Sequence, residues 1–132
     1  MAHPIMYDEQ DPLLARVREL ALDLPGAAEK VSHGRPNFFT TKVFAVYGGG
    51  RKLAPGKHER HDHALLFFAD PVELPALDQD ENFFSPAYLG PFGWRAVDLD
   101  VPGTDWAEIT ELIETSYRLT APKKLIAELD AR

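Results

Sequence analysis

The chain has 132 residues, of which 45% are hydrophobic and 27% charged, a balance that is ordinary for one soluble globular domain. It contains no cysteine, which excludes disulfide bonds, thiolate metal ligands and cysteine nucleophiles, and we expect a reducing, cytoplasmic setting. The formal net charge of −7 weighs against non-specific binding to polyanions, although a local basic patch can persist in an acidic protein.

The first residues are expected to form a flexible tail over 1–10, followed by a single domain over 11–132. They lack the basic start and apolar stretch of a signal peptide, and no apolar run approaches the roughly 20 residues of a membrane span. Asp11 and Pro12 have the pattern of an N-cap followed by proline at the first helical position. Apolar residues at helical spacing then predict a helix over 11–24, which Pro25 and Gly26 end.

The next part of the chain has the composition of short strands. We expect an edge strand over 28–33, a turn at 34–36, and a strand over 38–47, where aromatic and β-branched residues concentrate. Residues 48–63 are expected to form a long loop, of a length that is typically functional or disordered. The apolar run at 64–68 predicts a central strand.

The second half alternates short helices and strands. We expect a short helix over 70–77, an extended piece over 82–86 and a strand over 94–100. Asp105 and Glu108 have the spacing of a capping box, and the apolar residues that follow predict a helix that breaks near Pro122 before a last short helix. Strands grouped between helices predict an α+β fold: a single two-layer domain with a mostly antiparallel sheet and helices packed on one face.

Three blocks of the chain carry a family resemblance. They are residues 24–38 (LPGAAEKVSHGRPNF), residues 86–94 (PAYLGPFGW), and Asp105-Trp106 leading to residues 116–124 (SYRLTAPKK). In these blocks the chain resembles the MmcQ/YjbR-like family of small bacterial proteins. The resemblance implies a compact two-layer fold that has been likened to a double-wing DNA-binding arrangement, and it brings no catalytic residues, so we expect no enzyme activity. The long loop over 48–63 departs in length from the plainer family hairpin.

The same loop holds the basic island of an acidic chain. Its four cations outnumber its two carboxylates, Glu59 and Asp62, for a local balance of +2. The cations are Arg51, Lys52, Lys57 and Arg60. One hypothesis is a wing that contacts phosphates and gives affinity without reading bases. The alternative is a solvated hairpin whose charges keep a pair of strands soluble.

Arg35 is the other candidate contact, because its planar guanidinium could hold a carboxylate or a phosphate. The alternative is a structural salt bridge, to Glu29 or to a helix carboxylate. The aromatic residues of 88–94 could stack on bases or cap the edge of the core. Ser32 and His33 would point to opposite faces of a strand, so no nucleophilic triad is expected.

His58, His61 and His63 form an H-x-x-H-x-H pattern, which could take up Zn²⁺ or Ni²⁺ adventitiously. No further ligand sits at a diagnostic spacing, so we expect neither a physiological metal nor a cofactor. Lys123 and Lys124 near a helix start are either a ligand contact or simply solubilising.

Together these patterns favour a non-enzymatic DNA-binding module that uses Arg35 and the basic wing to contact duplex DNA, with no role at a membrane. A protein–protein adaptor that uses an exposed sheet face is an alternative. Small-molecule binding around Arg35 and residues 88–94 is a third. The sequence leaves the oligomeric state open.

Overall fold

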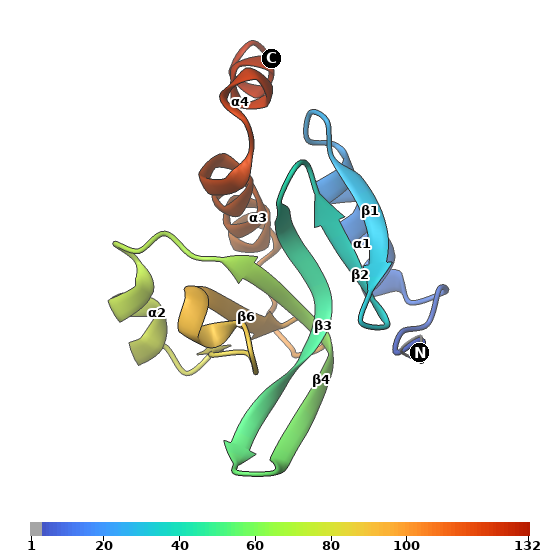
Figure 1. Ribbon diagram of the computed structural model, residues 1–132, viewed down its shortest axis with the longest axis vertical. Coiled ribbons are helices and arrows are strands. Elements are labelled where there is room, and N and C mark those ends of the chain that lie inside the picture. Colours follow the sequence, from blue (N-terminus) through green and yellow to red (C-terminus); the bar gives the residue numbers. More distant parts are fainter. Residues whose placement is uncertain (1–3) are drawn as a thin grey trace.

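The computed structural model describes residues 4–132, which form one α+β domain with four helices and a six-stranded sheet (Figure 1). The helices are α1 (Pro12–Leu22), α2 (Leu74–Gln79), α3 (Trp106–Thr120) and α4 (Lys123–Asp130), with a short 3₁₀ helix, η1 (Gly90–Phe92). The strands are β1 (Ala28–Ser32), β2 (Arg35–Phe39), β3 (Val43–Ala54), β4 (Lys57–Phe68), β5 (Phe83–Phe84) and β6 (Trp94–Asp98). Every strand pair is antiparallel, in the order β1-β2-β3-β4-β6-β5, which confirms the predicted fold class.

The helices pack on one face of the sheet, as predicted. Buried side chains from α1 and α3, among them Val17 and Ile113, meet alternate residues of the central strands such as Leu65 and Phe67. Apolar side chains of α2 and α4 pack against the same cluster at its margins. Asp105 begins α3 by accepting hydrogen bonds from two backbone N–H groups of the first turn, which is the predicted N-cap. No helix in residues 4–132 is long and apolar enough to cross a membrane.

The opposite face of the sheet carries a second, smaller apolar cluster on which no α-helix packs. Val46, Leu66, Phe84 and Ala96 are buried there, and Trp94 with neighbouring apolar side chains packs against them. The chain between β5 and β6, which includes η1, covers part of this face. Consecutive residues of β4 are buried because alternate side chains enter the two clusters.

The turn of the β1–β2 hairpin lies one residue earlier in the chain than predicted. His33 and Gly34, with φ of 53° and 78°, join β1 to β2, and Arg35 already faces Ser32 as the first residue of β2. The expected turn at 34–36 is therefore wrong. Pro36 is accommodated in β2 because it forms, with Val31, the second residue pair from the turn. At that pair a backbone N–H of β2 would point away from β1, so proline costs the hairpin no hydrogen bond. The expected strand over 38–47 is accordingly two strands, β2 and β3, separated by a turn.

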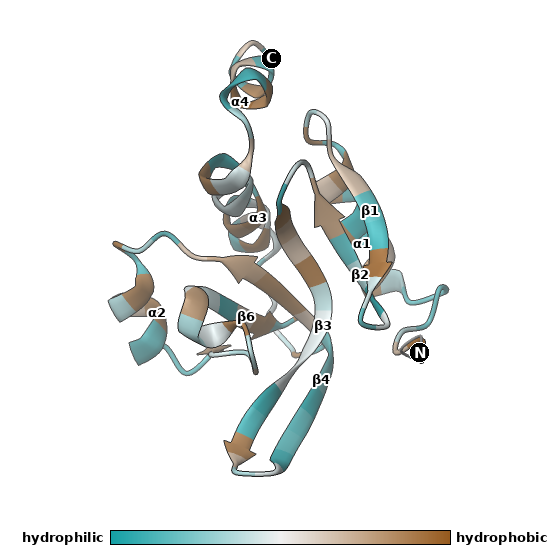
Figure 2. Cartoon of the chain, in the orientation of Figure 1, coloured by the Kyte–Doolittle hydropathy of each residue, from teal (hydrophilic) through white to brown (hydrophobic). Residues whose placement is uncertain are grey.

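The expected long loop over 48–63 is wrong as well. β3 and β4 are each 12 residues long and stay paired from Ala45 and Phe67 out to Ala54 and Lys57, where Pro55 and Gly56 close the turn. The outer part of this pair extends beyond the body of the molecule (Figure 1). Figure 2 shows the change along both strands from brown, apolar residues inside the domain to mostly teal, hydrophilic ones in the outer part. We call residues 50–60 the ribbon arm.

The start of the chain lies against the first hairpin. Met6 N–H donates to the Gly34 carbonyl at 2.9 Å, and Tyr7 packs against the helix-side core. Residues 4–10 form no helix or strand. Residues 1–3 of the predicted flexible tail lie outside the described residues, and mobility of the tail stays a prediction.

Candidate functional site

A groove of about 800 Å³ lies on the helix-free face of the sheet, at the base of the ribbon arm. The turn of the first hairpin and Met6 bound it on one side, and the segment 87–89 with Trp94 bounds it on the other. It joins Arg35 and Asn37 to the aromatic segment around Tyr88, two regions that the sequence separates by about fifty residues. A pocket of this volume falls within the roughly 300–1,000 Å³ typical of small-molecule sites.

The floor of the groove is apolar. Val46 and Leu66 reach it from the central strands, and Leu89 and Trp94 form an apolar wall. Gly49 leaves the Leu66 side chain its place in the floor, since a Cβ there would lie 2.9 Å from it. The floor thus offers an apolar surface, beside the Trp94 ring, against which an apolar group can pack.

One end of the groove is cationic. Arg35 is only 9% exposed and donates to Asp62 Oδ1 at 2.9 Å, and exposed Arg60 donates to the same oxygen at 3.1 Å. Burial would raise the pKa of Asp62, but the two guanidinium groups outweigh it and hold that pKa below its ordinary value. Two arginines share one carboxylate, so the cluster has a formal charge of +1 in a chain of −7.

Arg35 is therefore a strand residue in an ion pair, although its partner is neither Glu29 nor a helix carboxylate. Glu29 instead holds Arg18. The Arg35 guanidinium also donates to the Met6 carbonyl at 3.4 Å, so two of its five N–H donors are engaged within the described chain. Gly48, with a φ of 88°, permits this placement, because a Cβ there would collide with the guanidinium.

Asn37 and His58 have different neighbours at the groove. Asn37 is buried and donates to the Arg35 carbonyl at 2.9 Å, so its amide is committed to the backbone. His58 stacks on Tyr88, with the ring centroids 6.0 Å apart. The Ala87 N–H donates to the Gly50 carbonyl at 2.8 Å, which ties the segment 87–89 to the base of the arm.

The aromatic segment divides between the two roles considered for it. Trp94 packs against the second cluster, as an edge cap does. Tyr88 and Phe92 are 82% and 74% exposed, so they remain open to solvent or a ligand.

The ribbon arm distributes its cations over both faces. Arg51 is directly opposite Glu59 and Lys52 opposite His58, so alternation along the strands places Arg51 and Lys57 on one face and Lys52 and Arg60 on the other. All four side chains belong to exposed residues. In the described part of the chain, Lys52 and Lys57 form no ion pair.

The three histidines of the H-x-x-H-x-H pattern do not converge. His61 bridges Glu59 on its own strand, at 2.6 Å, and Asp98 on β6, at 2.8 Å. Burial would lower the pKa of His61, but these two carboxylates outweigh it and raise that pKa above its ordinary value. His58 faces Tyr88, and His63 lies on the helix side. Residues 4–132 contain no group of three or more His, Cys, Asp or Glu side chains arranged to hold a metal ion.

His63 belongs to a polar cluster with Asp11 and Tyr47 that the sequence did not indicate. Tyr47 is fully buried and donates to Asp11 Oδ2 at 2.5 Å, and His63 Nδ1 lies 2.8 Å from the same oxygen. Burial, followed by the hydrogen bond to Asp11, raises the pKa of Tyr47 and keeps it a donor. Asp11 also caps α1 through Leu13 N–H, so the cluster fastens the first helix to β3 and β4.

Lys123 and Lys124 lie on α4, at the opposite end of the molecule from the ribbon arm (Figure 1). They do not join Arg35 and the arm in one cationic surface.

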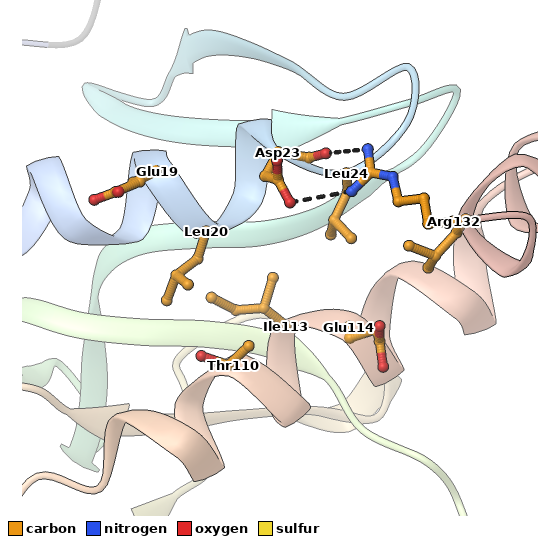
Figure 3. A pocket seen from close by; sticks show the side chains of 9 residues that line it. Glu19, Leu20, Asp23, Leu24, Thr110, Ile113, Glu114 and Arg132 are labelled. Atoms are coloured by element: carbon orange, nitrogen blue, oxygen red, sulfur yellow. Dashed lines mark hydrogen bonds and ion pairs between the residues drawn. The ribbon is translucent and has the colours of Figure 1, made fainter.

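A second hollow, of about 380 Å³, lies between α1 and α3 on the helix side. Figure 3 shows Arg132 at this hollow, where it is held by Asp23. Glu19, Asp23 and Glu114 line the same hollow and make it acidic, so it is unsuited to an anion.

The structure thus brings together Arg35, Arg60 and Tyr88, and leaves Arg51 and Lys57 on the other face of the arm. The residues that sequence reasoning missed are the apolar floor and Asp62 as the shared acid. The unbroken apolar run in 64–68 was a usable signal for the floor, because it requires cover on both faces of the strand.

Comparison with protein families gives one match. The family model described as YjbR matches residues 22–119, which include both strands of the arm, the residues that line the groove apart from Met6, and most of α3. No curated protein and no solved structure matches the chain.

Proposed function

This chain belongs to the YjbR family, and from that premise we propose that it is a cytoplasmic, non-enzymatic module that binds duplex DNA through the ribbon arm. The observation that carries the proposal is the arm itself. It is a two-stranded projection with exposed cations on both faces. The local balance of the arm and its base, residues 48–63, is +2 in a chain of −7.

The shape of the arm suits a groove of DNA. The major groove of B-DNA admits a two-stranded β-ribbon. A ribbon that enters tip first presents its faces to the two phosphate walls, so cations on both faces are usable. Lys52 and Lys57, on different faces and without ion pairs in the described chain, are the freest phosphate contacts. Arg60 is partly committed to Asp62.

The remaining surface works against tight binding. A net charge of −7 repels the phosphate backbone beyond the arm, so affinity should be modest. The cation–phosphate contacts of the arm release counterions from DNA, so affinity should also fall with salt. If all four cations contact phosphates, the slope of log K against log salt is roughly −4.

Fluorescence anisotropy of a labelled short duplex, measured over a low-salt series, tests the proposal. We expect Lys52→Gln with Lys57→Gln to weaken binding and to reduce the salt slope by about 2. The matched control is Lys123→Gln with Lys124→Gln, which removes the same charge from α4 and should leave both quantities almost unchanged. Absence of binding at low salt, or an equal loss in the control, contradicts the proposal.

A further inference from the structure

We infer that the groove at the base of the ribbon arm is a binding site for a small organic anion with a flat, apolar body, such as an aromatic carboxylate or sulfonate. The inference goes beyond DNA binding by the arm and does not depend on it. It stands on the shape of the groove, its apolar floor and the cationic cluster at one end.

The enclosure of the groove favours a small molecule. Met6 and the His33–Gly34 turn, the base of the arm, and the segment 87–89 surround it on several sides. A protein partner would need a broad accessible surface, whereas this site offers a bounded space at one end of which a single charged group can be held.

The chemistry of the cationic end selects an anion. Asp62 Oδ1 is shared by two guanidinium groups, which leaves one positive charge without a matching carboxylate in the cluster. Glu59, the other acid at the groove, is held 2.6 Å from His61, which it shares with Asp98, and so belongs to a separate ion-pair cluster from Asp62. A carboxylate or sulfonate can therefore bind the unused N–H donors of Arg35 and Arg60.

The floor selects the body of the ligand. Val46, Leu66 and Leu89 provide apolar contact without a polar group that needs a partner, and Trp94 provides an aromatic wall. A planar ring can lie on this surface while its charged group reaches the arginines. An uncharged ring gains only the apolar part of this interaction.

Two matched probes separate these contributions: anilinonaphthalene sulfonate and its uncharged parent anilinonaphthalene. Amide proton–nitrogen correlation spectra of the labelled full chain, recorded during a titration, report where each probe binds. We expect saturable shifts of the Gly49 amide and of the Trp94 indole N–H, with the Trp106 indole unchanged. Trp106→Phe assigns the two indole signals. The sulfonate should bind at least about tenfold more tightly than the uncharged probe.

Two exposed arginines of the same arm provide the matched variants. Arg60→Gln removes a residue of the groove and should weaken sulfonate binding several-fold, whereas Arg51→Gln removes the same charge outside it and should have no effect. Equal affinity for the two probes, shifts confined to the helix side, or equal losses in both variants overturn the inference. The pair of lysine substitutions that weakens DNA binding should leave probe binding unchanged, so the two proposals fail separately.

Discussion

Removing the Asp11 carboxylate should be among the most damaging single changes on the helix side of the protein. One side chain caps α1 through Leu13 N–H and accepts from both Tyr47 and His63, so Asp11→Ala breaks three interactions at once. Loss of an N-cap costs about 1 kcal/mol, and loss of a hydrogen bond to a charged group costs about 1.5–3 kcal/mol. Tyr47 keeps a neighbour in His63 Nδ1, 2.9 Å away, which limits the damage. We therefore expect the free energy of unfolding to fall by about 2–4 kcal/mol.

Asp11→Asn is the matched control, because asparagine caps a helix well and its carbonyl can still accept from Tyr47. Only the charge is lost, so we expect at most about half the effect of Asp11→Ala. Urea unfolding followed by circular dichroism at neutral pH measures both variants. Equal destabilisation by the two substitutions, or a loss under about 1 kcal/mol for alanine, refutes the reasoning.

The stability that Asp11 provides should depend on pH. Burial would raise the pKa of Asp11, but the hydrogen bonds from Tyr47, Leu13 N–H and His63 together outweigh it and hold that pKa below its ordinary value. The carboxylate therefore contributes stability that is present above its unfolded-state pKa and is lost as the pH falls through the folded one. The stability difference between the native chain and Asp11→Asn should accordingly shrink in acid.

Two further substitutions test other contacts. Ser116→Ala on α3 should lower the free energy of unfolding by about 2–4 kcal/mol in urea titrations. The buried Ser116 hydroxyl donates to the Phe44 carbonyl and accepts from Phe68 N–H, and both bonds are lost. A loss below about 1 kcal/mol contradicts this role. His61→Gln should be most destabilising below pH of about 6.5, the ordinary pKa of histidine. The pKa of His61 is raised in the folded protein, so the stability that its charge contributes is lost as the pH rises through the folded value. A difference in unfolding free energy between the two proteins that stays constant across pH contradicts the bridge to Asp98.

Much of the fold could be predicted from the sequence because the signals are local. The Asp11-Pro12 start of α1, the Asp105 cap and the Pro122 break are each carried by adjacent residues, and the structure confirms them. The ribbon arm was missed for a physical reason: strands exposed on both faces have no apolar alternation to reveal them. The first turn was misplaced because Pro36 suggested a corner, whereas His33 takes the left-handed conformation.

The site was less predictable because its partners are distant in sequence. Arg35 was singled out for its charge, but nothing local indicates that Asp62, on a strand two positions away in the sheet, would share its carboxylate with Arg60. The groove likewise depends on where the segment 87–89 crosses the sheet, a property of the topology rather than of any motif.

The arm also bears on how relatives of this protein can diverge. Because Lys52 and Lys57 are exposed, belong to neither apolar cluster and form no ion pair in the described chain, changes in their charge should have little cost in folding free energy. Selection can then tune the reach and charge of the arm while the domain that holds it stays the same. A stable body joined to a freely variable projection allows one scaffold to acquire new partners by small steps.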